Sequence, residues 1–210
     1  MTLFRSGVKL TPMKKLSTYL FLILFSFSAP SFADDISDLQ IEGISIGDSL
    51  LDHLSKEEII TEIEINKPAY NYLTEDFGEV YLFSNFDTYT SLSFKVKTTD
   101  KNYTIYAIKG AIFYDDKLEQ CFAQQKEIEK EFSSMYKNAK KRKYSLKLTL
   151  DPTGESVTHN IEFTFDSGDF IEINCTKYKK SLKIENGWRD ALQVIIDTKE
   201  VADWFSNPIN

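Results

Sequence analysis

The chain has 210 residues, of which 25 are Lys or Arg and 32 are Asp or Glu, so its formal net charge at pH 7 is −7. An acidic chain of this kind has no broad basic surface for phosphates, so nucleic acid is not an expected partner. Two histidines and two cysteines are too few and too widely spaced for a zinc cluster. We therefore expect no metal and no other cofactor.

The first 33 residues have the pattern of a secretory signal peptide. Residues 13–15 (Met-Lys-Lys) are followed by an apolar run over 19–27 and by Ser-Phe-Ala at 31–33. A charged start, a short apolar centre and small residues at the cleavage positions are typical of such peptides, and the run is too short to span a bilayer. We expect residue 13 to be the natural start, with 1–12 a mis-called extension, and cleavage after Ala33 to release one domain, residues 34–210.

Export predicts an oxidising compartment, most simply the periplasm, and no stable membrane insertion after cleavage. The removed segment carries four basic residues and no acidic one, so the mature chain has a formal net charge of −11. In an oxidising compartment two cysteines, Cys121 and Cys175, predict one disulfide. Two free buried thiols are the alternative.

The first half of the mature chain has helix and strand signals in turn. Apolar alternation predicts a short strand over 38–46, followed by a short helix over 49–54. Ser55 and Glu58 form a capping box that predicts a further helical segment through Glu62. Residues 63–78 have no clean period and are expected to be mostly loop. The strands expected after them cover 79–84, 90–97 and 103–114 and form a meander.

The strongest helix signal runs from Asp116 to about Lys140. Asp116 and Glu119 fit a capping box, and the basic run 140–143 fits the negative end of a helix dipole. We interpret that run as a solvated helix end, with an anion-binding patch as the alternative. Residues with apolar or aromatic side chains recur at three- and four-residue steps and form one stripe: Leu118, Cys121, Phe122, Ile128, Phe132, Met135 and Tyr136.

A second meander is expected over 144–150, 158–166 and 169–178, and a strand over 192–196 precedes a short C-terminal helix capped by Asp197. The pattern predicts an α+β fold of antiparallel β meanders packed on the one long amphipathic helix, and it also fits a helix-plus-meander repeat. If the helix runs back along the next strand, both cysteines lie at the same end of the sheet. The basic residues 140–143 and 177–180 then lie at opposite ends.

Gly-Asp-Ser-Leu at 47–50 resembles the nucleophile block of the GDSL esterase family. The resemblance implies Ser49 as nucleophile, and His53, four residues further on, is the nearest base. The downstream Gly-x-Asn-Asp of that family is absent, and His159 has Ser156 where the family has an aspartate. In the alternative interpretation, the glycine at 47 permits a turn and Asp48 caps the following helix.

Aromatic residues crowd the region 70–89. They are expected to form core and sheet surface, with an apolar or sugar-stacking groove as the alternative. The residues are Tyr70, Tyr72, Tyr81, Phe83, Phe86 and Tyr89.

Residues 39–54, Cys121 on a helix, and residues 165–170 before the Cys175 strand resemble a family of small exported proteins of marine alphaproteobacteria. That family has no assigned activity, so the resemblance implies no functional residue. The order of strand, Gly-polar-Ser, helix and meander is also similar to small α+β lipoproteins of outer-membrane assembly, although this chain has no lipid-anchor cysteine.

The sequence thus leads to a hypothesis of a periplasmic, non-catalytic protein that binds an unknown envelope protein or a small ligand. A GDSL-like esterase using Ser49 and a carbohydrate-binding domain are the alternatives.

Overall fold

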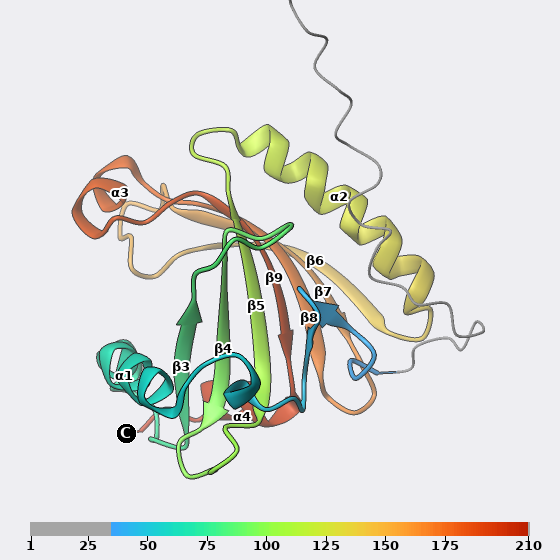
Figure 1. Ribbon diagram of the computed structural model, residues 1–210. Coiled ribbons are helices and arrows are strands. Elements are labelled where there is room, and N and C mark those ends of the chain that lie inside the picture. The colour runs from blue at the N-terminus through green and yellow to red at the C-terminus, as the bar shows by residue number, and fades with distance from the viewer. Residues whose placement is uncertain (1–34, 210) are drawn as a thin grey trace, which may run out of the picture. The chain divides into compact units, whose positions relative to one another are not determined.

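The computed structural model describes residues 35–209, and every structural statement below concerns that part of the chain. The expected signal peptide, residues 1–33, lies outside the described residues. The described chain holds four α-helices and one large antiparallel β-sheet (Figure 1). The expected α+β class is therefore confirmed.

The large sheet is built from seven strands: β3 (Phe77–Leu82), β4 (Ser91–Lys97), β5 (Ile105–Phe113), β6 (Lys140–Lys147), β7 (Val157–Thr164), β8 (Phe170–Lys177) and β9 (Ala191–Asp197). They follow one another in the order β3-β4-β5-β9-β8-β7-β6, and every neighbouring pair is antiparallel. The two expected meanders belong to one sheet, because β9 pairs with β5 on one side and with β8 on the other.

The helices are α1 (Lys56–Asn66), α2 (Leu118–Met135), α3 (Lys180–Asn186) and α4 (Lys199–Ser206). Two short strands, β1 (Gln40–Ile41) and β2 (Ile44–Ser45), form a separate hairpin, and η2 (Leu50–Asp52) and η3 (Lys67–Tyr70) are single 3-10 turns. None of the helices in residues 35–209 combines the length and the apolar character needed to cross a membrane.

One face of the large sheet is apolar and is called the apolar face below. α2 contacts β8 and β9, and α1 contacts β3. Burial of each large apolar side chain on this face contributes roughly 1.5–3 kcal/mol to stability. Those that are almost fully buried include Leu92, Phe94, Ile108, Phe163, Ile171, Ile173, Leu192 and Ile196.

The predicted disulfide is confirmed. Cys121 of α2 and Cys175 of β8 are bonded, with their Cα atoms 6.0 Å apart, so the alternative of two free thiols is wrong. One turn further along α2, the Gln125 amide donates hydrogen bonds to the carbonyl oxygens of His159 at 2.7 Å and Ile173 at 2.8 Å. A covalent bond and a satisfied buried amide therefore fix the same part of α2 on the sheet.

α2 is shorter than the sequence predicts. It ends at Met135, and the basic run expected at its end instead begins strand β6 at Lys140. Lys141 and Lys143 lie 2.9 and 2.6 Å from the carboxylate of Glu129 on α2. Alternate residues of a strand point to the same face, so Lys141 and Lys143 can both reach the Glu129 carboxylate. A helix continued through this run would turn the two lysines to different faces. The interpretation of the run as a solvated helix end is wrong for this reason.

Two expected helix caps are also wrong. Asp116 has a left-handed φ of 60°, and its carboxylate accepts a hydrogen bond from Lys183 at 2.7 Å, while Lys117 is the N-cap of α2. Asp197 is the last residue of β9, and the hydroxyl of Thr198 caps α4 instead. Asp116 thus binds a lysine distant in sequence, and Asp197 belongs to the sheet, so neither aspartate is the helix cap.

The capping box of α1 is confirmed, but the helix is longer than expected. The Ser55 amide donates to the Glu58 carboxylate at 2.8 Å, and the Glu58 amide donates to the Ser55 hydroxyl at 3.3 Å. The helix runs to Asn66, inside the segment expected to be loop. Its Ile63 packs so closely on Gly78 of β3 that a Cβ at Gly78 would lie 2.7 Å from the Ile63 side chain. Because Ile63 and Gly78 are distant in sequence, this contact produces no periodic pattern from which the longer helix could be predicted.

Candidate functional site

The face of the large sheet opposite the apolar face carries mainly hydrogen-bonding side chains and is called the polar face below. α4 packs on one end of it, where Val201 and Trp204 contact Phe77 and Ala107. The strand register places one row of side chains across all seven strands, called the central row: Tyr81, Ser93, Lys109, Ile195, Glu172, Glu162 and Arg142.

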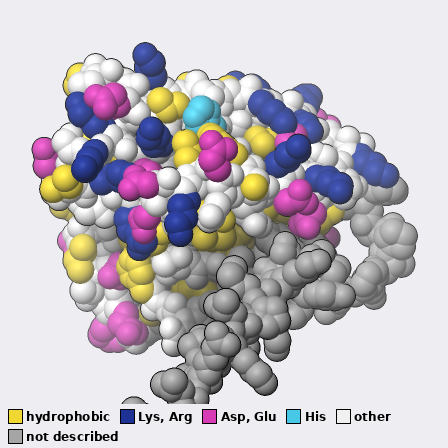
Figure 2. All heavy atoms as spheres, turned by 90° about the horizontal axis from the view of Figure 1, so that it is seen from above, with side chains coloured by type: hydrophobic (Ala, Val, Ile, Leu, Met, Phe, Trp, Pro, Cys, Tyr) yellow, Lys and Arg dark blue, Asp and Glu magenta, His cyan; other side chains and the backbone are white. Residues whose placement is uncertain are grey.

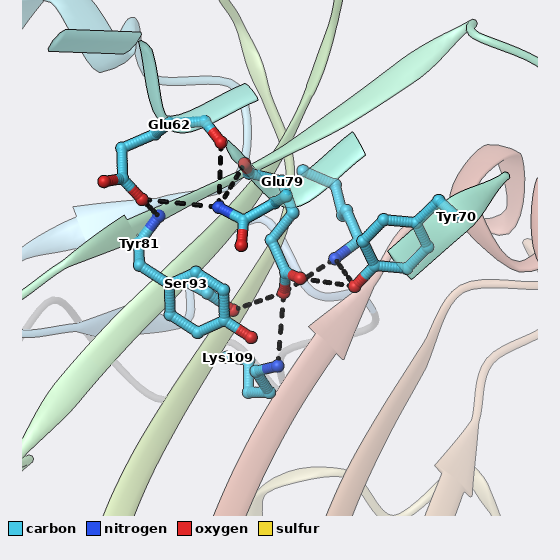
Figure 3. A network of polar contacts seen from close by, with 8 residues as sticks. Glu62, Tyr70, Glu79, Tyr81, Ser93 and Lys109 are labelled. Carbon is cyan, nitrogen blue, oxygen red and sulfur yellow. Dashed lines mark hydrogen bonds and ion pairs between the residues drawn. The ribbon is translucent and has the colours of Figure 1, made fainter. Parts of the chain in front are cut away.

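Glu79 lies at the centre of a buried polar network on this face (Figure 3). Its carboxylate lies 2.8 Å from the Lys95 ammonium and 3.2 Å from the Lys109 ammonium. The Ser93 hydroxyl donates to it at 3.0 Å, and the Tyr70 hydroxyl donates to it as well. A carboxylate that is 2 % exposed thus has four donors from three different elements, β4, β5 and η3, which meets the requirement that a buried charge be paired.

The network changes the proton affinities of its members. Burial alone would raise the pKa of Glu79, but Lys109 and Lys95 outweigh it and lower the pKa to about 2. Burial lowers the pKa of Lys95 to about 8, although Glu79 acts against this shift. At neutral pH the network therefore holds one carboxylate and two ammonium groups.

Asp197 lies two strands from Lys95 in the same transverse row of the sheet. Burial raises the pKa of its carboxyl to about 7, and Lys95 only partly offsets this effect. The cluster of Glu79, Lys95, Lys109 and Asp197 is thus close to neutral when Asp197 is ionised, and carries one positive charge when it is protonated.

The β6–β8 half of the polar face pairs donors with acceptors in the same way. Arg142 lies 3.0 Å from Glu162, and the Tyr144 hydroxyl lies 3.1 Å from Glu162 and 2.8 Å from Glu172. The amide of Asn174 donates to Glu172 at 3.0 Å. The face as a whole therefore presents donors and acceptors with nearly balanced charge, and has no field of one sign that would select an ion.

Aromatic rings lie in the central row and at one end of the polar face. Tyr81 stacks on Phe83 with ring centroids 6.2 Å apart, and the Lys109 ammonium lies 5.3 Å from the centre of the Tyr81 ring. Tyr178 and Trp188, which follow β8 and precede β9, form a second pair with centroids 5.2 Å apart. The Phe83 side chain is 70 % exposed, so at least one of these rings is free to meet a ligand.

A hollow of about 410 Å³ lies beside α4 at one end of the polar face. Lys97 and Glu200 in its wall form an ion pair at 2.6 Å, and the indole nitrogen of Trp204 donates to the carbonyl of Thr74 at 2.9 Å. The other lining residues are Asp76, Phe77, Thr99, Asp203 and Asn207. Asp203 in the wall pairs with Lys199, and Asp76 accepts a hydrogen bond from the Thr74 hydroxyl, so the charged groups of the hollow all have partners within the protein.

The basic residues 140–143 and 177–180 lie at opposite ends of the sheet, as expected. Lys140 pairs with Thr164 at one end of β7, and Lys177 pairs with Val157 at the other. Figure 2 looks onto the end that carries α3 and the start of α2, where Lys and Arg side chains are interleaved with Asp and Glu. The two basic runs therefore do not combine into one anion site.

Ser49 and His53 lie on either side of η2. The Ser49 hydroxyl donates to the carbonyl oxygen of Asn102 at 2.7 Å and accepts the Leu51 amide at 3.3 Å, so it is the N-cap of η2. Asp48, the expected cap, instead accepts the Ser45 amide at 2.8 Å. The Ser49 hydroxyl is thus held by backbone groups. Its role as an esterase nucleophile stays a prediction.

A serine–histidine contact does occur elsewhere, between strands β6 and β7. The Ser145 hydroxyl lies 2.8 Å from Nδ1 of His159, and the Phe122 ring packs edge-on against the imidazole with centroids 5.1 Å apart. Ser156, which stands at the family's aspartate spacing, accepts the Lys179 amide instead. We interpret the Ser145–His159 contact as a cross-strand hydrogen bond on an exposed strand.

The residues of the buried network were only partly visible in the sequence. The alternation over 90–97 places Ser93 and Lys95 on the side opposite the apolar residues, as the structure has them. The pairing of Lys95 with Glu79 and Lys109 depends on the register of three strands, and no local signal gives that register. Of the expected aromatic cluster, Tyr70 and Tyr81 lie on the polar face, whereas Tyr89 packs on Gly110 at the apolar face.

Comparison with known proteins gives no assignment, because no family model, no curated protein and no solved structure matches this chain.

Proposed function

We propose that the protein is an exported, non-catalytic binding protein and that the polar face is its ligand-binding surface. The observation that supports this proposal is the central row. In it Lys109, Glu172 and Glu162 are half-buried, in the middle of a sheet face whose apolar packing against α4 is at one end. A sheet face without a ligand function is more commonly either apolar and covered or fully solvated.

The balanced charge and the flanking rings favour a polar, uncharged ligand with many hydroxyl groups. Carboxylates, amides and tyrosine hydroxyls supply donors and acceptors for hydroxyl groups, and exposed rings such as Phe83 supply flat surfaces for stacking. An oligosaccharide has this chemistry. We propose it as the ligand class ahead of an envelope protein, because the row is half-buried and not flat and apolar as a protein interface core is.

Intrinsic fluorescence gives a direct test, because the two tryptophans of the chain, Trp188 and Trp204, lie at opposite ends of the polar face. We expect saturable quenching on titration with chito-, cello- or malto-oligosaccharides. Gln193, half-buried on β9 beside the central row, is replaced by Leu, and the same change at the exposed Gln120 of α2 is the matched control.

The Gln193→Leu variant should lose most of the quenching while Gln120→Leu keeps it, with equal thermal midpoints for both variants. Equal binding by the two variants would place the ligand away from the polar face. Absence of quenching by all three glycan series would remove the oligosaccharide as ligand class.

We further propose that the protein acts in the periplasm after removal of residues 1–33. The disulfide between Cys121 and Cys175 supports an oxidising compartment. We propose that the protein belongs to the family of small exported proteins of marine alphaproteobacteria. We also propose that the β3–β5 and β6–β8 halves of the sheet descend from one helix-plus-meander unit. The common descent is supported by the chain order, because α1 precedes β3–β5 and α2 precedes β6–β8.

A further inference from the structure

The two edges of the large sheet differ in whether the outward-pointing backbone amides and carbonyls have hydrogen-bond partners. On the β3 edge, side chains of α1 bind two of them: the Asn66 amide donates to the carbonyl of Glu79 at 3.3 Å, and the Glu62 carboxylate accepts the Tyr81 amide at 3.2 Å (Figure 3). On the β6 edge, no strand among residues 35–209 pairs with the outer side. The β3 edge is blocked against strand addition and the β6 edge is open to it.

β6 is a regular strand, and the register shows which of its backbone groups point outward. All eight residues pair in sequence with β7, and just beyond the strand the Leu148 amide donates to the carbonyl of Ser156 at 2.9 Å in the same register. In an antiparallel pair, hydrogen-bonded and non-hydrogen-bonded positions alternate. The amide and carbonyl groups of residues 141, 143, 145 and 147 therefore point away from β7.

The open edge is basic in a chain that is acidic overall. β6 carries four lysines and one arginine among its eight residues, and seven of the eight are exposed. Three carboxylates pair with these cations. Glu129 forms ion pairs with both Lys141 and Lys143, Glu162 pairs with Arg142, and Asp166 lies 3.8 Å from Lys140. Five cations against three carboxylates leave a net positive edge.

We propose that the β6 edge binds an extended acidic segment of another protein, which adds to the sheet as an eighth strand next to β6. The outward amides and carbonyls supply the main-chain hydrogen bonds of β-augmentation, and the lysine side chains select acidic residues on the added strand. A second copy of this chain is a poor occupant, because antiparallel pairing of two β6 strands would set lysine against lysine.

The probe is a fluorescein-labelled eight-residue peptide in which Glu alternates with Val, matched to the length of β6. Two control peptides carry either Lys in place of Glu or N-methyl groups on alternate backbone nitrogens. Binding to the mature protein is followed by fluorescence anisotropy. The acidic peptide should bind saturably, and each control should bind at least about tenfold more weakly, because one removes charge complementarity and the other the backbone pairing.

The matched protein variants are Ser145→Pro and Ser145→Ala. Both remove the hydroxyl, but only proline removes an outward amide, and an edge strand accepts proline at such a position. We expect Ser145→Pro to weaken peptide binding at least about tenfold and Ser145→Ala to leave it nearly unchanged. If Ser145→Pro does not fold, the N-methylated peptide gives the same information on the native protein.

Three results would overturn the proposal. They are absence of saturable binding by the acidic peptide, equal binding by the N-methylated peptide, and a dimer in sedimentation that Ser145→Pro dissociates. The first two remove strand addition, and the third makes a second copy the occupant. None of them bears on oligosaccharide binding at the polar face, so this inference and the proposed function fail separately.

Discussion

The Glu79 carboxylate lies 2.8 Å from the Lys95 ammonium, and the two side chains are 2 % and 8 % exposed. A pair this deeply buried stabilises the fold only if both charges stay compensated, because removing one partner leaves the other desolvated. Lys109, whose side chain is half-buried at the centre of the polar face, pairs with the same carboxylate. The network therefore joins the packing of β3, β4 and β5 to the surface that we propose binds ligand.

Glu79→Gln leaves Lys95 and Lys109 without their shared carboxylate. We expect the free energy of unfolding in urea at pH 7 to fall by about 3 kcal/mol, the usual cost of an uncompensated buried charge. The control is Glu75→Gln, which breaks the exposed pair with Lys67 at 2.9 Å and should leave the free energy of unfolding nearly unchanged, because water screens this pair. Equal losses in the two variants would show that the network is not held by charge pairing.

Asp197 predicts a pH dependence of stability. Its pKa rises from 3.8 to about 7 on folding, so between these values the folded protein binds more protons than the unfolded chain, and the free energy of unfolding falls as the pH rises. Glu79 acts in the opposite sense below pH 4.5, because its pKa falls from 4.5 to about 2 on folding and its contribution is lost as the pH falls through that range.

Asp197→Asn should therefore flatten the stability profile between about pH 4 and pH 7 and should be more stable than the native protein at pH 8. Urea unfolding across this pH range measures both effects. Asp203→Asn, at an exposed position of α4, is the control and should leave the profile unchanged. An unchanged profile in Asp197→Asn would mean that this carboxyl does not titrate in the window.

The disulfide closes a loop between residues 54 positions apart. Replacing Cys121 and Cys175 by Ser should lower the free energy of unfolding by about 4 kcal/mol, because the unfolded chain regains the entropy of that loop. Reduction of the native protein should have the same effect and should not lower the double variant further. Two alkylatable thiols in the denatured, unreduced protein would contradict the disulfide itself.

Gly110 of β5 lies under the ring of Tyr89. A Cβ at this position would be 2.5 Å from the ring, so Gly110→Ala forces the tyrosine out of its place. We expect a loss of about 1–3 kcal/mol in thermal or urea unfolding, as for other overpacked cores. Combining it with Tyr89→Leu should recover part of this loss, and strictly additive losses would show that the two residues are not in contact.

Ser49 tests the catalytic alternative. Its hydroxyl is held by the Asn102 carbonyl and the Leu51 amide, so we expect no labelling by a fluorophosphonate probe in the native protein. Labelling that disappears in Ser49→Ala would restore the esterase hypothesis, and with it a role for His53.

Local signals in the sequence predicted the parts of the fold that depend on neighbouring residues. The capping box of Ser55 and Glu58 needs only four consecutive residues, and the Cys121–Cys175 bond followed from export and the expected direction of one helix. The error at Lys140 has the opposite cause. A run of basic residues fits a helix end and an edge strand equally well, and Glu129, eleven residues earlier, decides between them.

The polar face shows the same limit. Alternation in β4 indicated which side chains leave the core, but the meeting of Glu79, Lys95 and Lys109 requires the pairing of three strands. The sequence distances within this group are 14 to 30 residues, so no local pattern contains it.

The most direct test of the proposed function is a two-dimensional NMR titration of the isotope-labelled mature protein with the oligosaccharide that quenches its tryptophans. We predict that the largest amide shift changes fall on the central row and its neighbours, including Tyr81, Lys109, Glu172 and Gln193. Changes confined to the apolar-face elements or to the β6 edge would contradict a binding surface on the polar face.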